Sequence, residues 1–284
     1  ELWTEHADWL FEHPDDPNGQ RLLDLGDPAA REWLTDRVDR LITEQGIDLY
    51  RQDFNMEPLP YWRAADAPDR RGISENRYVS GLLAYWDELL RRFPGMLIDE
   101  CASGGRRNDI EMLSRSIPLW RSDCILEPTA QQSQTYGISS WIPYYGTGAK
   151  ALDEYTLRSQ FALNVNGLWD LRCDDLDYDL IRRLMAEWRD YAPLMLGDFY
   201  PLTGHHIEND VWMAWQFDRP DLNRGMVQVF RRPDSPYEQA RFRLGGLDRE
   251  ARYRLRDLNR SEWDVEVVGA ELMDAGLTII IEER

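Results

Sequence analysis

Lysine is almost absent from this chain. Lys150 is the single lysine among 284 residues, and the other 32 basic residues are arginines. An aldolase-type α/β enzyme needs a lysine that forms a Schiff base with its substrate. Lys150 lies beyond a strand end in the glycine-rich turn GTGAK, so this class is disfavoured. The turn is not a phosphate loop either, because its second glycine comes too early and no Ser or Thr follows the lysine.

Cysteine and histidine are also scarce, and their spacing carries no metal or disulfide signal. The three cysteines, Cys101, Cys124 and Cys173, are odd in number and widely spaced. This pattern fits neither a disulfide framework nor a zinc site. The four histidines form no metal-binding pattern. We therefore expect neither a metal nor a cofactor.

No hydrophobic run approaches the length of a membrane span, and the net charge is −19. Such a surface repels phosphates, so nucleic acid and anionic membranes are poor candidate partners. A neutral carbohydrate would not be repelled, and the chain has twelve tryptophans. Indole rings can stack on sugars, which makes Trp62 and Trp141 candidate platforms, although tryptophans more often belong to a core.

From about residue 20 to 195 the pattern alternates short strands and amphipathic helices, which predicts a parallel sheet. Asp27 is expected to cap a helix that opens with Pro28. Further helices are expected from Ser74, over 109–114, over about 152–163 and over about 177–191. The expected strands are 47–50, 96–98, 117–120, 140–144 and 167–171.

These five βα units favour part of a (β/α)8 barrel over residues 1–197, because five units do not close eight strands. The first residues, ELWTEHADWL, are typical of the middle of a domain, so we expect the earlier strands upstream. The strand at 47–50 should then have an open edge in this chain. A longer polypeptide would cover that edge, and a homo-oligomer is the other way to cover it.

After Pro201 the sequence pattern changes to short runs in which apolar and polar residues alternate, with turn residues between the runs. This pattern predicts a small antiparallel β-sandwich over residues 198–284.

Four acids stand where the expected parallel strands end: Asp53, Asp99, Asp123 and Asp170. In a barrel such residues face the mouth of the active site. Two carboxylates at this position are the catalytic groups that a glycosidase uses. Each acid could equally cap a helix or pair with one of the many arginines. Taken singly, each is best interpreted as structural.

The order of three motifs decides between these interpretations. RQDFN (51–55) is similar to KWDMN, CASGGRRND (101–109) is similar to a Cys-x-Ser-Gly-Gly turn, and WRSD (120–123) is similar to a Trp-x-Ser-Asp motif. LLDLGDPAAREWL (22–34) is similar to an LDLS-x-P-x-x-R stretch. In this order the motifs resemble those of α-galactosidases of glycoside hydrolase family 36.

The resemblance implies a retaining glycosidase in which Asp53 is the nucleophile and Asp123 the acid/base, held about 5–5.5 Å apart. Arg51 is then the cation that keeps Asp53 ionised, and Trp120 and Cys124 provide a less polar setting for Asp123. The substrate-binding residues that it implies are Arg51, Asn55, Cys101, Ser103, Gly104 and Trp120.

This sequence departs from the family pattern at three places in the expected sugar pocket. Arg51 stands where most members have Lys, Asn18 where many have Arg, and CILEPTAQQ (124–132) lacks a second Asp. The expected substrate is a terminal α-linked galactose, and α-linked N-acetylgalactosamine remains open. A non-hydrolytic sugar-binding homologue is the alternative of another class.

Overall fold

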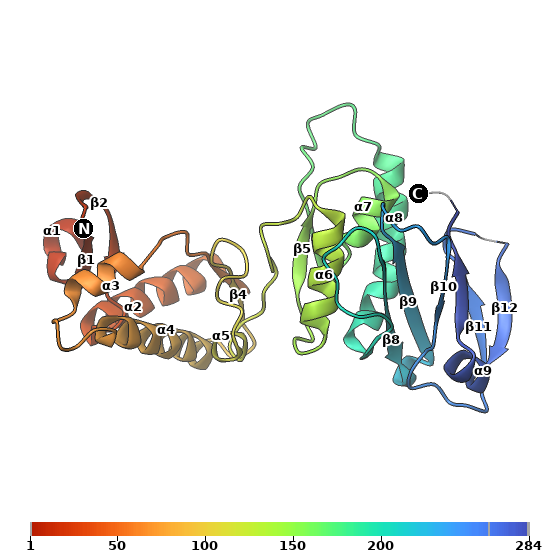
Figure 1. Cartoon of the computed structure of the whole chain (residues 1–284). Coiled ribbons are helices and arrows are strands. Elements are labelled where there is room, and N and C mark those ends of the chain that lie inside the picture. The colour runs from red at the N-terminus through yellow and green to blue at the C-terminus, as the bar shows by residue number, and fades with distance from the viewer. Residues whose placement is uncertain (1, 261, 283–284) are drawn as a thin grey trace. The chain divides into compact units, whose positions relative to one another are not determined.

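The computed structural model describes residues 2–260 and 262–282. The chain divides into two compact units, Glu1–Asp123 and Cys124–Arg284 (Figure 1). Within the described residues, no helix combines the length and the apolar character that a membrane crossing requires.

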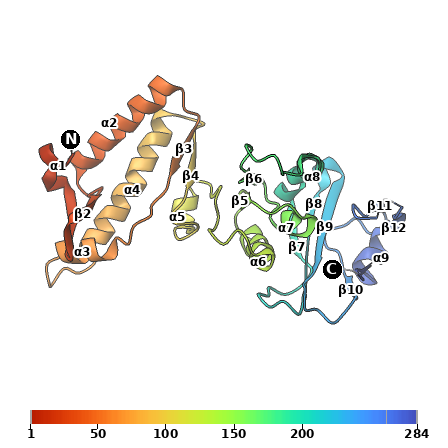
Figure 2. The same ribbon diagram turned by 90° about the horizontal axis from the view of Figure 1, so that it is seen from above.

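The first unit combines an antiparallel hairpin, a helical layer and a parallel strand pair. Its helices are α1 (Leu2–Glu5), α2 (Pro28–Gln45), α3 (Leu59–Ala65), α4 (Ile73–Arg92) and α5 (Ile110–Leu113), with a 3-10 turn, η1 (Ala7–Trp9). Its strands are β1 (Leu10–His13), β2 (Asp16–Leu23), β3 (Leu49–Gln52) and β4 (Leu97–Glu100). β1 pairs with β2 antiparallel. β3 pairs with β4 parallel, and the two lie side by side in Figure 2.

Local signals set the helix ends in this unit. The Asp27 carboxylate accepts hydrogen bonds from the backbone N–H groups of Ala29 and Ala30, which confirms the expected cap of α2. Gly46 ends α2 in the left-handed conformation, with φ 64°. α4 begins at Ile73, one residue before the expected start, and buries Leu82, Tyr85, Trp86 and Leu89.

The second unit continues the βα pattern and then becomes antiparallel. Its helices are α6 (Pro128–Ser139), α7 (Glu154–Ser159), α8 (Tyr178–Tyr191) and α9 (Gly269–Asp274), with 3-10 turns η2 (Ala192–Leu196) and η3 (Pro220–Leu222). Its strands are β5 (Gly146–Ala149), β6 (Asn164–Gly167), β7 (Asp198–Pro201), β8 (Trp212–Arg219), β9 (Arg224–Arg231), β10 (Gln239–Phe242), β11 (Arg252–Arg256), β12 (Asp264–Val268) and β13 (Leu277–Ile280).

The strands of the second unit form four separate groups. β5 and β6 pair in parallel, and β7, β8 and β9 form an antiparallel sheet. β10 pairs with β13 and β11 pairs with β12, both antiparallel. The expected change from parallel to antiparallel strands is therefore present, and the described residues contain no closed barrel.

Several strand predictions were wrong in position. Residues 117–120 form only an isolated parallel bridge, between Ile117 and Asp99, and the chain turns at Leu119–Trp120. Residues 140–144 are not a strand, since β5 begins only at Gly146. The strand expected at 167–171 lies at Asn164–Gly167 instead. Asp123 and Asp170 accordingly lie in loops and do not close strands.

Helix α6 was not expected, because its buried face is polar. Gln131, Gln132 and Thr135 are at most 1 % exposed. Gln131 accepts a hydrogen bond from Thr147 of β5 at 2.8 Å. A helix that buries amides and hydroxyls lacks the apolar period that identifies amphipathic helices.

Candidate active site

Asp53 is placed by the alternation of side chains along β3. Tyr50 and Gln52 face α4, where Tyr85 donates a hydrogen bond to Tyr50 at 3.0 Å and the Trp86 indole donates one to Gln52 at 2.7 Å. Because successive side chains of a strand point to opposite faces, Arg51 lies on the other face. Asp53 follows directly after the strand, and its side chain is 38 % exposed.

The Asp53 carboxylate accepts several hydrogen bonds. Its Oδ1 accepts from the backbone N–H of Phe54 at 2.8 Å and from that of Ser103 at 3.4 Å. Burial alone would raise the pKa of Asp53, but bonds from the side chains of Asn55 and Cys101 and from these two N–H groups lower it below its ordinary value. Donors favour the ionised form of a carboxyl group. The site therefore holds an ionised, partly exposed carboxylate.

Arg51 lies beside Asp53, but its short hydrogen bond goes to another acid. Arg51 Nη1 donates to Asp99 Oδ2 at 2.5 Å, whereas its Nη2 lies 3.9 Å from Asp53 Oδ2. Arg51 and Asp99 are register partners on β3 and β4. The sequence showed Asp99 only as one more strand-end acid, and its link to Arg51 depends on that register.

The turn after β4 brings the first and second motifs together. Cys101 is 1 % exposed, and Asp53 is among the groups that influence the pKa of its thiol. Burial raises the pKa of this thiol. Ser103 adopts a left-handed backbone with φ 48°, and its hydroxyl donates to Asn55 Oδ1 at 2.7 Å. The Cys101–Ser103 turn thus packs directly on Asp53 and Asn55.

Gly104 joins this turn to the third motif. It has φ 79°, and a Cβ at this position would lie 2.7 Å from the backbone nitrogen of Asp123. Only glycine permits so close an approach in this conformation. The Ser103–Gly104 segment therefore contacts Asp53 on one side and the backbone of Asp123 on the other.

Asp123 is exposed, and Trp120 holds its side chain. The Trp120 indole Nε1 donates to Asp123 Oδ1 at 2.7 Å, so the contact is a hydrogen bond through the polar edge of the ring. Two backbone bonds tie the preceding segment to β4, Ile117 N to Ile98 O at 2.9 Å and Glu100 N to Ile117 O at 3.0 Å. Cys124 is exposed and falls in the other compact unit.

Other candidates lie elsewhere. Trp62 is 8 % exposed and belongs to the core beside Tyr78, so it is not a sugar platform. Asp170 is exposed and forms an ion pair with Arg172 at 2.7 Å, in line with its structural interpretation. In the part of the chain that the structure describes, no group of three or more His, Cys, Asp and Glu side chains could hold a metal ion.

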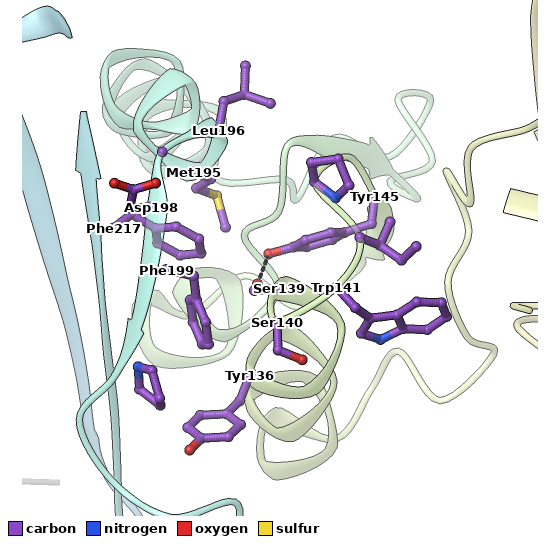
Figure 3. A pocket seen from close by; sticks show the side chains of 14 residues that line it. Tyr136, Ser139, Ser140, Trp141, Tyr145, Met195, Leu196, Asp198, Phe199 and Phe217 are labelled. Carbon is purple, nitrogen blue, oxygen red and sulfur yellow. Dashed lines mark hydrogen bonds between the residues drawn. The ribbon is translucent and has the colours of Figure 1, made fainter. Parts of the chain in front are cut away.

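A cavity of about 580 Å³ in the second unit does not include the carboxylate site (Figure 3). The exposed Trp141 lines it, together with Tyr136, Tyr145 and Phe199. Ser139 and Tyr145 share a hydrogen bond of 2.6 Å at its wall. No residue of the three motifs lines this cavity.

Comparison with known proteins gives two family matches. The melibiase family matches residues 1–153, which is more than half of the 284 residues, and the glycosyl hydrolase family 36 C-terminal domain matches residues 212–281. Alpha-galactosidase 1 of Pediococcus pentosaceus is 28 % identical over 81 % of this chain, which spans 33 % of that relative. Alpha-galactosidase AgaA of Geobacillus stearothermophilus is 25 % identical over 98 % of this chain, which spans 40 % of that relative.

Solved structures share this fold over the whole chain. The alpha-galactosidase of Lactobacillus brevis has a TM-score of 0.81 at 21 % identity, and this chain covers 40 % of it. The AgaA structure has the same TM-score at 23 % identity, with 41 % covered. The chain thus spans about a third to two fifths of the length of these relatives. It belongs to the melibiase family, glycoside hydrolase family 36.

Proposed function

We propose that this chain carries the catalytic carboxylates of a retaining α-galactosidase, with Asp53 as nucleophile and Asp123 as acid/base. The observation that carries the proposal is the Ser103–Gly104 segment, which contacts Asp53 through the Ser103 N–H and approaches the backbone of Asp123 at Gly104. One rigid turn between two acids suits a reaction in which both act on the same glycosidic bond.

The reaction has two steps that use the same pair of carboxylates. Asp53 attacks the anomeric carbon and forms a covalent glycosyl-enzyme, while Asp123 gives its proton to the departing glycosidic oxygen. Asp123, now ionised, takes a proton from water, and the resulting oxygen nucleophile displaces Asp53 from the same carbon. Two inversions give net retention, and both side chains return to their starting protonation states.

The environment of Asp53 supports its role as nucleophile. Its hydrogen bonds keep the pKa below the ordinary value, so the carboxylate is ionised at neutral pH. We assign substrate contacts to Arg51, Asn55, Cys101, Ser103, Gly104 and Trp120, which surround the two acids. The curated relatives bear the name alpha-galactosidase, which supports galactose as the sugar.

The proposal includes a (β/α)8 barrel of which residues 1–197 form a portion, followed by a β-sandwich over 198–284. Leu49 and Leu97 are register partners on β3 and β4, and they are 40 % and 50 % exposed. Within this chain no strand other than β4 pairs with β3 in the described residues. Apolar side chains on that open face are what further barrel strands would bury.

The test compares nitrophenyl α-galactoside with nitrophenyl α-N-acetylgalactosaminide, using the complete protein that contains this chain. We expect hydrolysis of the galactoside, with the first-formed sugar in the α configuration by NMR. The Asp53→Asn variant is the matched control and should be inactive. Hydrolysis of the N-acetylgalactosaminide alone would correct the sugar, and sugar binding without hydrolysis of either would refute the enzymatic proposal.

A further inference from the structure

Asp99 is a buried carboxylate that bonds to residues close to each of the two acids in the chain, and the proposed reaction does not use it directly. It is 3 % exposed, and each of its oxygens has its own partner. Oδ2 accepts from Arg51 on β3 at 2.5 Å. Oδ1 accepts from the backbone N–H of Leu119 at 3.1 Å, in the segment that leads to Asp123; this N–H is shared with the backbone oxygen of Ile117 at 3.2 Å.

We infer that Asp99 is a positioning residue whose single carboxylate holds both Arg51, beside the nucleophile, and Leu119, beside the acid/base. The inference rests on the proposed function, since it assigns roles relative to Asp53 and Asp123. The hydrogen bonds of Asp99 go to Arg51 and Leu119 and not to either acid, so it acts through these two partners.

The bond between Arg51 and Asp99, the first arm of this arrangement, controls the distance between Arg51 and the proposed nucleophile. With Nη1 bound to Asp99, the guanidinium leaves its Nη2 3.9 Å from Asp53 Oδ2, beyond hydrogen-bond distance. A guanidinium that bound Asp53 closely would stabilise the carboxylate before attack more than during it, which slows the attack. Asp99 therefore keeps Arg51 close to the nucleophile without a direct bond to it.

The bond from the Leu119 N–H to Asp99, the second arm, supports the proposed acid/base. Leu119 immediately precedes Trp120, whose indole donates to Asp123 at 2.7 Å. This segment is not a regular strand, so the side chain of Asp99 supplies one of the bonds that a sheet ladder would otherwise provide. Loss of that bond should displace Trp120 and, with it, the side chain of Asp123.

Other charged groups stand close to this arrangement and must be held constant in any test of pH dependence. Next to Asp53 is the thiol of Cys101, and next to Asp99 is Glu100, which pairs with Arg107 at 2.8 Å. Arg106 and Glu57 form a pair at the Ser103 turn. None of these groups is changed in the variants below.

The decisive variant is Asp99→Asn, tested in the complete protein. An asparagine keeps the size of the side chain, and its carbonyl can still accept from Leu119, but its amide cannot accept from Arg51. Arg51 is then released toward Asp53. We expect kcat to fall by roughly 10- to 100-fold and the acidic limb of kcat/KM to move to lower pH, because a closer cation favours ionised Asp53.

Two further variants separate positioning from general damage. Asp87→Asn removes the ion pair between the exposed Asp87 on α4 and Arg115, which are 2.7 Å apart. It should leave kcat and the acidic limb of kcat/KM unchanged. In an Arg51→Met background, Asp99→Asn should no longer move the limb. The role of the Arg51–Asp99 bond would be refuted if the acidic limb of kcat/KM stayed at its wild-type pH in Asp99→Asn. It would also be refuted if the limb moved by the same amount in the Arg51→Met background.

The second arm is tested by comparing Asp99→Ala with Asp99→Asn. Alanine also removes the bond to Leu119, so its additional loss of kcat/KM should be greatest on substrates with poor leaving groups, which need the proton of Asp123. An equal additional loss on good and poor leaving groups would refute this arm.

A readout without turnover separates this inference from the proposed function. Carbodiimide labels protonated carboxyl groups, so the pH at which labelling of Asp53 declines, measured by mass spectrometry, follows its protonation. We expect that pH to be lower in Asp99→Asn than in the wild type, even if the sugar assignment is wrong. An unchanged labelling profile in a folded Asp99→Asn protein would overturn the inference, whatever the activity.

Discussion

Asp53 accepts hydrogen bonds from the backbone N–H groups of Phe54 and Ser103. The Asn55 and Cys101 side chains also lower its pKa, so its charge is stabilised without a close guanidinium. The proposed nucleophile is thus kept ionised by hydrogen bonds of the turn, while Arg51 beside it is held by Asp99.

Replacement of the nucleophile should abolish turnover on every substrate. We expect Asp53→Ala to lower kcat by about 10⁴-fold or more, because no covalent intermediate can form. Added azide should enter from the vacated side and give a glycosyl azide of inverted configuration, which NMR identifies. A retained product in this variant would assign the nucleophile elsewhere.

Replacement of the acid/base should depend on the leaving group. Asp123→Ala should lower kcat/KM by about 10²- to 10⁴-fold on natural oligosaccharides. Activated aryl galactosides need no proton on the leaving oxygen, so the first step should be far less affected with them. Equal losses on both substrate classes, measured side by side, would give Asp123 another role.

Asn55 should set the acidic limb of the pH profile. The Asn55 side chain lowers the pKa of Asp53, so Asn55→Ala should raise that pKa. Since activity needs ionised Asp53, the acidic limb of kcat/KM should move to higher pH. The control is Asn76→Ala, an exposed residue on α4, which should leave the profile unchanged. A shift to lower pH in Asn55→Ala would contradict the assignment.

Among the elements, the turn after β4 is the most constrained. Ser103 and Gly104 are consecutive residues with positive φ, and Gly104 has no room for a side chain. Such conformations persist only where the surroundings impose them, and they concentrate at functional sites.

A methyl group at Gly104 should therefore impair both stability and catalysis. Gly104→Ala must relieve the 2.7 Å approach to Asp123 N as well as the strain of φ 79°, at a cost of roughly 2–4 kcal/mol of unfolding free energy. Gly95→Ala is the matched control, with φ 92° and no atom within 4 Å. It should cost about 1 kcal/mol with kcat unchanged. Equal effects of the two substitutions on kcat would remove the turn from the catalytic machinery.

For the whole molecule, the open face of β3 and β4 has a consequence for solution behaviour. Leu49 and Leu97 stand side by side on a two-stranded parallel pair, exposed in this chain. Exposed apolar side chains beside an unpaired strand edge favour association.

The 284-residue chain expressed by itself should self-associate, as measured by light scattering after gel filtration. Leu49→Arg should reduce that association, because a charge on the open face disfavours contact. The control is Ile110→Arg on α5, which adds the same charge at a residue that is 77 % exposed and should have little effect. A monomeric wild-type chain would show that this face needs no cover.

Much of the helical frame could be predicted because its signals are local. Asp27 and Asp177 cap the helices that follow them, and α4 carries an apolar stripe. α6 escaped prediction because it buries Gln131 and Gln132, which bond to Thr147 of β5 and to Arg232 after β9. A buried amide is stable only where tertiary structure supplies its hydrogen bonds, so no local pattern marks it.

For the site, the sequence by itself determined which residues we propose to carry the chemistry. Asp53 follows a strand, and the three motifs name the acids and the turn between them. Only the tertiary structure decided the long-range partners: Arg51 bonds to Asp99, and Ser103 bonds to Asp53 and Asn55. Strand register and a left-handed turn create these contacts, and both depend on residues some fifty positions apart in the chain. Chemical type is local to each residue, whereas its partner is a property of the fold.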